Sequence, residues 1–389
     1  MVRTLLVAAI ACLLAALSHA QSAAADTLTT GSYANSAGTL SYELFVPSSY
    51  TPGTAAPLVV ALHGCTQTAD QFRQQTRLDA LAAAKGFIVV FPEQSSGNNS
   101  YRCWNWFQDQ HMHRGAGEPS LIAGITSQIQ QQYTVDPRRT YVAGFSAGAA
   151  MAEVMGATYP DMYAAVGVGS GCEYQAGAPC AGYRSEDPEQ AGHAAYQAMG
   201  SNARMVPFIV FQGDQDNTVP PVNAQQLVQA GLVAADLADD GSENNSVPKD
   251  AAKSSLGRSS AMQSESYTTS YYSDGHGHEL AQYWVVHGMG HAWSGGNASM
   301  QYSDASGPDE SAAMYDFFAS HPMPAGGSVS WPAMSGGVGG WPGGPPTLPT
   351  APLTSPTGWQ TLSASVMCAV LPATLKSLPG MQNVCPSHS

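Results

Sequence analysis

A five-residue motif, Gly-Phe-Ser-Ala-Gly at positions 144–148, constrains the fold of this chain more than any other feature. It follows a short apolar run at 140–143 and precedes residues 149–155, whose alanine and methionine content favours a helix. Strand, Gly-x-Ser-x-Gly and helix, in this order, form the context of a nucleophile elbow, in which glycines permit a sharp turn that exposes the serine. The motif therefore predicts a nucleophilic Ser146, although a glycine-rich turn with a structural serine is the alternative.

Apolar segments that predict strands alternate with segments of helical spacing between residues 25 and 321. Alternation of this kind is typical of an α/β fold with a mainly parallel sheet and helices on both faces. We assign residues 21–321 to one domain and interpret the polar stretch 234–266 as a flexible insertion. Strands are expected at 40–46, 57–62, 87–91, 141–145, 164–168, 206–211, 267–272 and 280–286, and helices at 69–85, 121–133, 149–155, 224–233 and 311–319.

The two ends of the chain differ from this domain. Residues 1–20 have the pattern of a secretory signal peptide, with Arg3 ahead of a short apolar run and small residues at a cleavage site. Residues 322–358 are rich in proline and glycine and are expected to form a linker, followed by a short tail at 359–389. The tryptophans of this region either bind an apolar polymer surface or pack back on the domain.

Cysteine content agrees with export. One of the seven cysteines, Cys12, lies within the signal-like segment, so six remain in the mature chain, and an even number in an exported protein favours disulfides. Proximity in the sequence suggests the pairs Cys65–Cys103, Cys172–Cys180 and Cys368–Cys385.

Charge restricts the possible partners. The net charge is −14, only 11% of residues are charged, and no basic patch is present. A nucleic-acid partner is therefore not expected, and a polyanionic substrate is disfavoured. No membrane association is expected either, and the composition suits a protein that acts on neutral material.

An acid should follow the serine in chain order. The apolar strand 206–211 ends in a turn that contains Asp214 and Asp216, and the carboxyl end of a parallel strand faces the active-site crevice. We prefer Asp216 as the acid, because Asp214 lies nearer the strand and can cap the turn.

The base should be a histidine after the acid. We prefer His291, which lies on a loop just past the strand 280–286, whereas His287 at the strand end is expected to be structural. Gly288 and Gly290 argue against a helical zinc pair of these two histidines, so no metal is expected. The other candidates are His276, His278, His321 and His388.

The oxyanion site should lie after the strand 57–62. The backbone N–H of Cys65 is expected to join that of Ala147, the residue after the nucleophile. A Cys65–Cys103 disulfide would fix this loop and bring Trp104 and Trp106 to the mouth of the site, where aromatic side chains could contact substrate. Packing in the core is the alternative role for both tryptophans.

Five ordered motifs together resemble the poly(3-hydroxybutyrate) depolymerase family of esterases. They are residues 62–68, residues 103–107, the serine motif, residues 213–219 and the segment Gly-Met-Gly-His-Ala-Trp-Ser-Gly-Gly at 288–296, which contains Trp293, a third expected substrate contact. The resemblance implies an α/β-hydrolase fold and a secreted, cofactor-free enzyme that hydrolyses esters. It maps the family's nucleophile, acid and base onto Ser146, Asp216 and His291, and its oxyanion donor onto Cys65.

The resemblance leaves the substrate open. The expected function is hydrolysis of poly(3-hydroxybutyrate)-type polyesters or their oligomers by a monomer, and the main alternative is a feruloyl or acetyl-xylan carbohydrate esterase. The C-terminal region is shorter than the substrate-binding domain that depolymerases often carry, so soluble oligomers or amorphous polyester are the safer expectation. A peptidase or amidase on the same fold, and a non-catalytic polymer-binding protein, are the rival classes.

Overall fold

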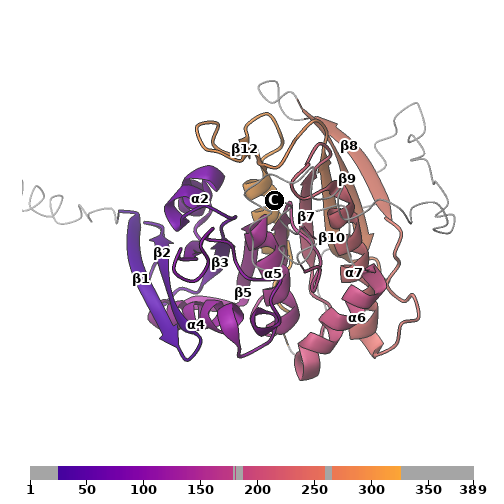
Figure 1. Ribbon diagram of the computed structural model, residues 1–389, viewed down its shortest axis with the longest axis horizontal. Coiled ribbons are helices and arrows are strands. Elements are labelled where there is room, and N and C mark those ends of the chain that lie inside the picture. The colour runs from indigo at the N-terminus through magenta and orange to yellow at the C-terminus, as the bar shows by residue number, and fades with distance from the viewer. Residues whose placement is uncertain (1–24, 178–179, 181–186, 259–264, 326–389) are drawn as a thin grey trace, which may run out of the picture. The chain divides into compact units, whose positions relative to one another are not determined.

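The computed structural model describes residues 25–177, 180, 187–258 and 265–325. Ten strands form one sheet: β1 (Thr27–Asn35), β2 (Gly38–Val46), β3 (Ala56–Leu62), β4 (Ile88–Glu93), β5 (Val135–Phe145), β6 (Val166–Gly169), β7 (Phe208–Gly213), β8 (Lys253–Arg258), β9 (Ser266–Ser273) and β10 (Glu279–Val286). Their spatial order is β1-β2-β4-β3-β5-β6-β7-β10-β9-β8 (Figure 1). The strands from β4 to β10 in this order pair in parallel, and both edges are antiparallel.

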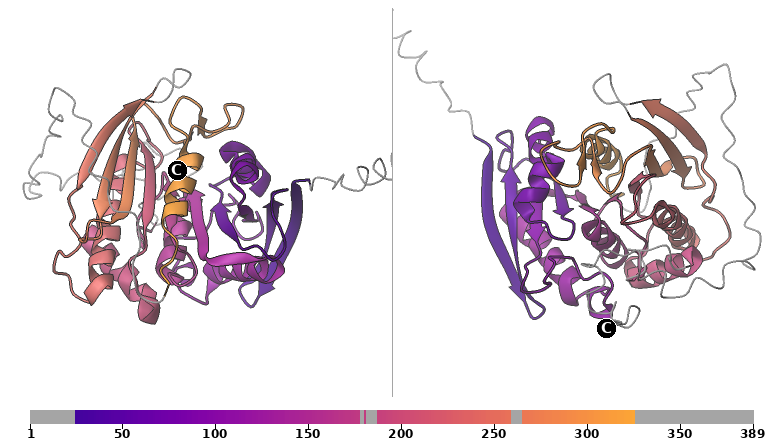
Figure 2. Two further views of the ribbon diagram at one scale, coloured as in Figure 1. Left: turned by 180° about the vertical axis from the view of Figure 1, so that it is seen from behind. Right: turned by 45° about the horizontal axis from the view of Figure 1, so that its top comes forward.

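Helices cover both faces of this sheet, as the views in Figure 2 show. One face carries α4 (Gly117–Gln132), α5 (Ala147–Thr158), α6 (Pro188–Met199) and α7 (Pro221–Asp240). The other carries α2 (Ala69–Thr76), α3 (Leu78–Lys85) and α8 (Glu310–Ser320). A small two-stranded sheet joins β11 (Trp293–Ser294) to β12 (Ser303–Asp304). The predicted α/β class, with a mainly parallel sheet between helices, is confirmed.

The core follows from the composition of the central strands. Every residue of β3 is buried, as expected for a strand whose two faces are both covered by helices. Leu58 and Val60 belong to the apolar cluster on the α5 side, and Val59 and Ala61 to the cluster on the α8 side. Burial of each valine or leucine contributes about 2 kcal/mol. The sheet is therefore a rigid support for the loops at the carboxyl ends of its strands.

Some predicted boundaries were wrong. The helix expected at 69–85 is two helices, because Arg77 adopts a left-handed conformation with φ 53° and ends the first one. The stretch 234–266 is not a flexible insertion in its described part: Leu237 is buried in the last turns of α7, and 253–258 forms the edge strand β8. Strand β1 and helix α6 were not predicted.

The described residues contain no helix that is both long and apolar enough to cross a lipid bilayer. The predicted signal segment 1–20, the tail 359–389 and all but the first four residues of the linker lie outside the described residues.

Candidate active site

Ser146 lies at the turn between β5 and α5. Its backbone has φ 55° and ψ −119°, a conformation that non-glycine residues rarely adopt and that is found mainly at functional sites. A Cβ atom on Gly144 would lie 2.2 Å from the Gly148 carbonyl carbon, and one on Gly148 would lie 2.0 Å from the Leu62 carbonyl oxygen. Both flanking residues must therefore be glycine for this turn to form against the end of β3.

An acid–base pair lies at the ends of β7 and β10. His291 Nδ1 is 2.8 Å from Asp216 Oδ2. The buried Asp216 carboxylate also accepts hydrogen bonds from the backbone amides of Thr218 and Val219, at 2.8 and 2.9 Å. Burial alone would raise the pKa of Asp216, but the hydrogen bond and charge of His291, together with the two amides, outweigh it and lower the pKa. Asp216 is thus held as a carboxylate beside the imidazole.

Asp214 contacts a different histidine. Its Oδ2 is 3.0 Å from His287 Nδ1, and its Oδ1 accepts a hydrogen bond from the Gly288 amide at 2.9 Å. His287 Nε2 in turn lies 2.9 Å from the Thr268 hydroxyl on β9. The two loops that carry Asp216 and His291 are therefore joined by a second histidine–aspartate pair nearer the sheet. Its only signal in the sequence was the position of His287 at a strand end.

The imidazole of His291 lies beside the elbow. Its ring centroid is 4.8 Å from that of Phe145, the residue before the serine. Among the described residues no hydrogen bond joins Ser146 Oγ to His291 Nε2. Because Nδ1 is occupied by Asp216, Nε2 is the nitrogen left to face the serine. Hydrogen bonds of this kind are often long in free enzymes and tighten when substrate binds.

The loop after β3 is rigid. His63 is fully buried, and its Nε2 accepts a hydrogen bond from the Gln94 amide at 2.9 Å, so Nδ1 carries the proton and donates to the Gly64 carbonyl at 2.7 Å. Burial lowers the pKa of His63 to about 4, against the opposing effect of the Gly64 hydrogen bond. A disulfide joins Cys65 to Cys103.

Two backbone donors in this region are unoccupied. In the described part of the chain, the N–H groups of Cys65 and Ala147 have no hydrogen-bond acceptor, whereas those of the neighbouring Gly64 and Ser146 are bonded to Gln67 Oε1 and Gly169 O. Free N–H groups beside a nucleophile are what an oxyanion site requires.

A buried chain of amides extends from this loop to another segment. The Gly64 N–H donates to Gln67 Oε1 at 2.8 Å, Gln67 Nε2 donates to Gln75 Oε1, and Gln75 Nε2 donates to the Tyr302 carbonyl at 2.6 Å. Gly64 and Gln67 belong to the motif at 62–68, but the sequence assigned no role to Gln67 and did not single out Gln75 or Tyr302, because a glutamine on a helix such as Gln75 carries no motif. The chain of amides fixes the 302 segment relative to the candidate oxyanion loop.

The expected aromatic substrate contacts need correction. Trp104 and Trp293 are fully buried, and their indole N–H groups donate to the His63 carbonyl and the Ser311 hydroxyl, each at 3.0 Å. Their predicted role at the surface of the site is therefore wrong, since both pack in the core. Trp106 is partly exposed and packs against a small apolar cluster that includes Val219 and the Cys172–Cys180 disulfide.

Two of the three expected disulfides, Cys65–Cys103 and Cys172–Cys180, are present. The expected Cys368–Cys385 pair lies outside the described residues. Within the described ranges, no three His, Cys, Asp or Glu side chains are grouped so that they could hold a metal ion.

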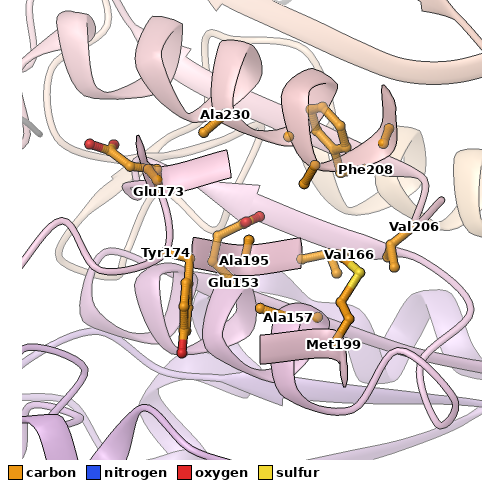
Figure 3. Close-up of a pocket in the computed structure, with 15 residues that line it drawn as sticks. Glu153, Ala157, Val166, Glu173, Tyr174, Ala195, Met199, Val206, Phe208 and Ala230 are labelled. Carbon is orange, nitrogen blue, oxygen red and sulfur yellow. The ribbon is translucent and has the colours of Figure 1, made fainter. Parts of the chain in front are cut away.

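A small cavity lies between α5, α6 and α7 and is shown in Figure 3. Its volume is about 40 Å³, which is room for one or two waters but not for an organic substrate. Its lining is apolar except for Tyr174 and the carboxyl groups of Glu153 and Glu173. Burial, and next the charge of Glu173, raise the pKa of Glu153 to about 8. This cavity is therefore a buried acidic feature separate from the candidate site.

The strand order, the elbow and the acid and histidine on successive strand ends define the α/β-hydrolase fold. The structure is similar to the acetyl xylan esterase from Aspergillus awamori, with a TM-score of 0.56 and 23% identity over 68% of this chain and 94% of that one. This likeness extends to the fold alone.

Sequence comparison gives the family. The profile described as "Esterase PHB depolymerase" matches residues 40–244, more than half of the chain, and the chain belongs to this family. It is 37% identical over 182 residues to poly(3-hydroxyalkanoate) depolymerase C from Paucimonas lemoignei, covering 45% of this chain and 44% of that protein. It is 33% identical over 201 residues to acetylxylan esterase A from Emericella nidulans, covering 47% and 63%. The chain thus spans about half the length of these curated relatives.

Proposed function

We propose that this protein is a secreted serine esterase that hydrolyses neutral esters, with polyhydroxyalkanoate-type polyesters or their oligomers as its main substrate class. The observation that carries the proposal is the 2.8 Å contact between His291 and Asp216 beside a strained serine elbow. Family membership and the similarity to a poly(3-hydroxyalkanoate) depolymerase support ester hydrolysis.

The reaction is acyl transfer in two steps. His291 Nε2 accepts the proton of Ser146 Oγ as the oxygen attacks the ester carbonyl, and Asp216 stabilises the imidazolium that forms. The tetrahedral oxyanion accepts hydrogen bonds from the Cys65 and Ala147 amides, each worth about 3 kcal/mol in the transition state. His291 then returns the proton to the alcohol oxygen as the carbon–oxygen bond breaks. Water then gives a proton to the same imidazole and attacks the acyl-serine, and that proton passes to Ser146 Oγ as the bond from the acyl carbon to the serine oxygen breaks and the acid leaves.

The buried groups around the site support this assignment of roles. The neutral, buried His63 has both ring nitrogens hydrogen-bonded, so it cannot exchange protons with substrate and instead holds the Cys65 loop. The His287–Asp214 pair holds the two loops that present Asp216 and His291. We assign positioning roles to both pairs of contacts.

A second candidate substrate class is the acetylated polysaccharide. It is favoured by the similarity to acetylxylan esterase A, which covers a larger share of that relative than the match to the depolymerase does. The test is a panel of purified-protein assays on amorphous polyhydroxybutyrate, 3-hydroxybutyrate oligomers, acetylated xylan and a feruloylated sugar. Release of 3-hydroxybutyrate supports the first class, release of acetate alone supports the second, and no release from any substrate contradicts both.

Export and quaternary state belong to the same proposal. Two disulfides in the described residues and the signal-like pattern at 1–20 support secretion, and we propose that the secreted chain is a monomer. Mass spectrometry of the secreted chain tests export, because retention of residues 1–20 would contradict it. Light scattering tests the monomeric state.

A further inference from the structure

Tyr302 is an exposed aromatic residue beside the candidate base. It has 42% of its surface exposed, more than any other tyrosine, tryptophan or phenylalanine among the described residues. Its ring centroid lies 6.1 Å from that of His291, at an interplanar angle of 74°, and 6.3 Å from that of Phe145. An aromatic ring in this position covers one side of the imidazole and leaves its own outer surface open to solvent.

The backbone of Tyr302 is held in an unfavourable conformation. Its φ is 58°, in the left-handed region that bulky residues rarely adopt. Two hydrogen bonds fix its carbonyl, from Gln75 Nε2 at 2.6 Å and from the Trp293 amide at 2.7 Å. A glycine would make the same backbone contacts without strain. A tyrosine kept at such a position, with its ring in solvent, points to a role for the ring itself.

The place of the ring determines which part of a substrate it can reach. In acyl transfer the imidazole gives its proton to the leaving alcohol oxygen, so the alcohol portion of an ester lies on the imidazole side of the serine. The acyl oxygen lies toward the Cys65 and Ala147 amides. A ring about 6 Å from the imidazole is therefore within contact distance of the alcohol portion, beyond its first few atoms.

The support of the ring is rigid. The buried amide chain from Gly64 through Gln67 and Gln75 to the Tyr302 carbonyl fixes the segment to the same loop that carries the candidate oxyanion donor. A contact surface held in register with the oxyanion site can orient a substrate at low entropic cost.

We propose that Tyr302 is a specificity residue that packs against the alcohol portion of the ester, so that the enzyme selects esters of bulky alcohols such as a hydroxyacyl chain or a sugar. This inference rests on the proposed esterase function and identifies the alcohol portion as the part of the substrate that Tyr302 contacts. The expected contribution of the ring is about tenfold in kcat/KM, the size of one aromatic packing contact.

The experiment compares two acetates that share the acyl group and differ in the alcohol, methyl acetate and benzyl acetate. Wild type, Tyr302→Phe, Tyr302→Ala and Tyr302→Gly are assayed on both, with melting temperatures. We expect Tyr302→Ala and Tyr302→Gly to lose about tenfold in kcat/KM on benzyl acetate and less than about twofold on methyl acetate, and Tyr302→Phe to keep wild-type selectivity. Tyr302→Gly should melt roughly 2 °C above Tyr302→Ala, because only glycine relieves the left-handed backbone.

The outcomes separate the two levels of the argument. Equal losses on both acetates, or none, in Tyr302→Ala and Tyr302→Gly would overturn the role of Tyr302 while wild-type turnover leaves the esterase function standing. Turnover of neither acetate by wild type that does hydrolyse an ester of the panel above would overturn this inference alone, and hydrolysis of no ester at all would overturn the esterase function as well.

Discussion

Replacement of Glu153 by glutamine should make the protein more stable at alkaline pH and leave its stability at acidic pH unchanged. Glu153 lines the small cavity next to Glu173, and its Oε1 has no hydrogen-bond partner among the described residues (Figure 3). Burial and the Glu173 charge raise its pKa to about 8. Between the pKa of the unfolded chain and that value, the folded protein holds a proton that the unfolded chain has lost.

The sign and size follow from this difference. A raised pKa means that the stabilisation is fully present below about pH 4.5 and is lost as pH rises through about 8, at about 1.4 kcal/mol per pH unit. The full difference between about 4.5 and about 8 corresponds to about 5 kcal/mol as an upper limit, and solvent screening of this partly exposed residue reduces it to about 2 kcal/mol. Glutamine has the shape of the protonated acid and does not ionise, so Glu153→Gln removes the loss.

Thermal melts at pH 5 and pH 9, at fixed ionic strength, measure the effect. We expect Glu153→Gln to melt within about 1 °C of wild type at pH 5 and roughly 5 °C above it at pH 9, for a domain of this size. The surface variant Glu189→Gln is the matched control and should change little at either pH. An equal difference at both pH values, or a lower melting temperature of Glu153→Gln at pH 9, would refute the argument that an ionised Glu153 is unfavourable here.

Three further predictions concern the candidate site. Asp216→Asn should lower kcat by about 10⁴ with little change in KM, whereas Asp214→Asn should lower kcat far less. Steady-state kinetics on one soluble ester measure both, and a larger loss of kcat in Asp214→Asn would show that the acid is wrongly assigned. Gly148→Ala should abolish folding or activity, because its Cβ would lie 2.0 Å from the Leu62 carbonyl oxygen, and a soluble, active variant seen by circular dichroism and assay would contradict this. Because the pKa of buried His63 is depressed, the unfolded chain takes up the His63 proton first as pH drops from about 6.5 to 4, so wild type should lose stability over that range relative to a His63→Gln variant, which lacks this titration. A difference in urea midpoint between the two proteins that does not change with pH would be inconsistent with it.

The central sheet could be predicted because its strands, such as β3 and β4, are short continuous apolar runs. Runs of this kind, separated by segments with helical spacing, are typical of parallel strands that helices cover on both faces. The elbow was recognisable because two glycines and a serine have a steric reason to occur together. The edge strand β8 was missed because its polar residues, with Leu256 exposed, carry no burial signal.

Parts of the site could not be read from the sequence for a different reason. Gln75 and Tyr302 are 227 residues apart, and nothing in either local sequence indicates that one amide will bind the other's carbonyl. Trp104 and Trp293 carry an aromatic signal that suits a binding wall or a core equally well, and only the packing decides between them. The position in the turn favoured Asp216 over Asp214, but only the side-chain contacts show which histidine each carboxylate pairs with.

The central claim is that folding makes one serine nucleophilic through a nearby imidazole. The most direct test is covalent labelling with a fluorophosphonate, read by intact mass and peptide mapping on wild type, Ser146→Ala and His291→Gln. The account predicts one adduct per chain, on Ser146, no adduct in Ser146→Ala and labelling slowed by at least about a hundredfold in His291→Gln. Labelling of another residue, no adduct on folded wild type, or an unchanged rate in His291→Gln would contradict it.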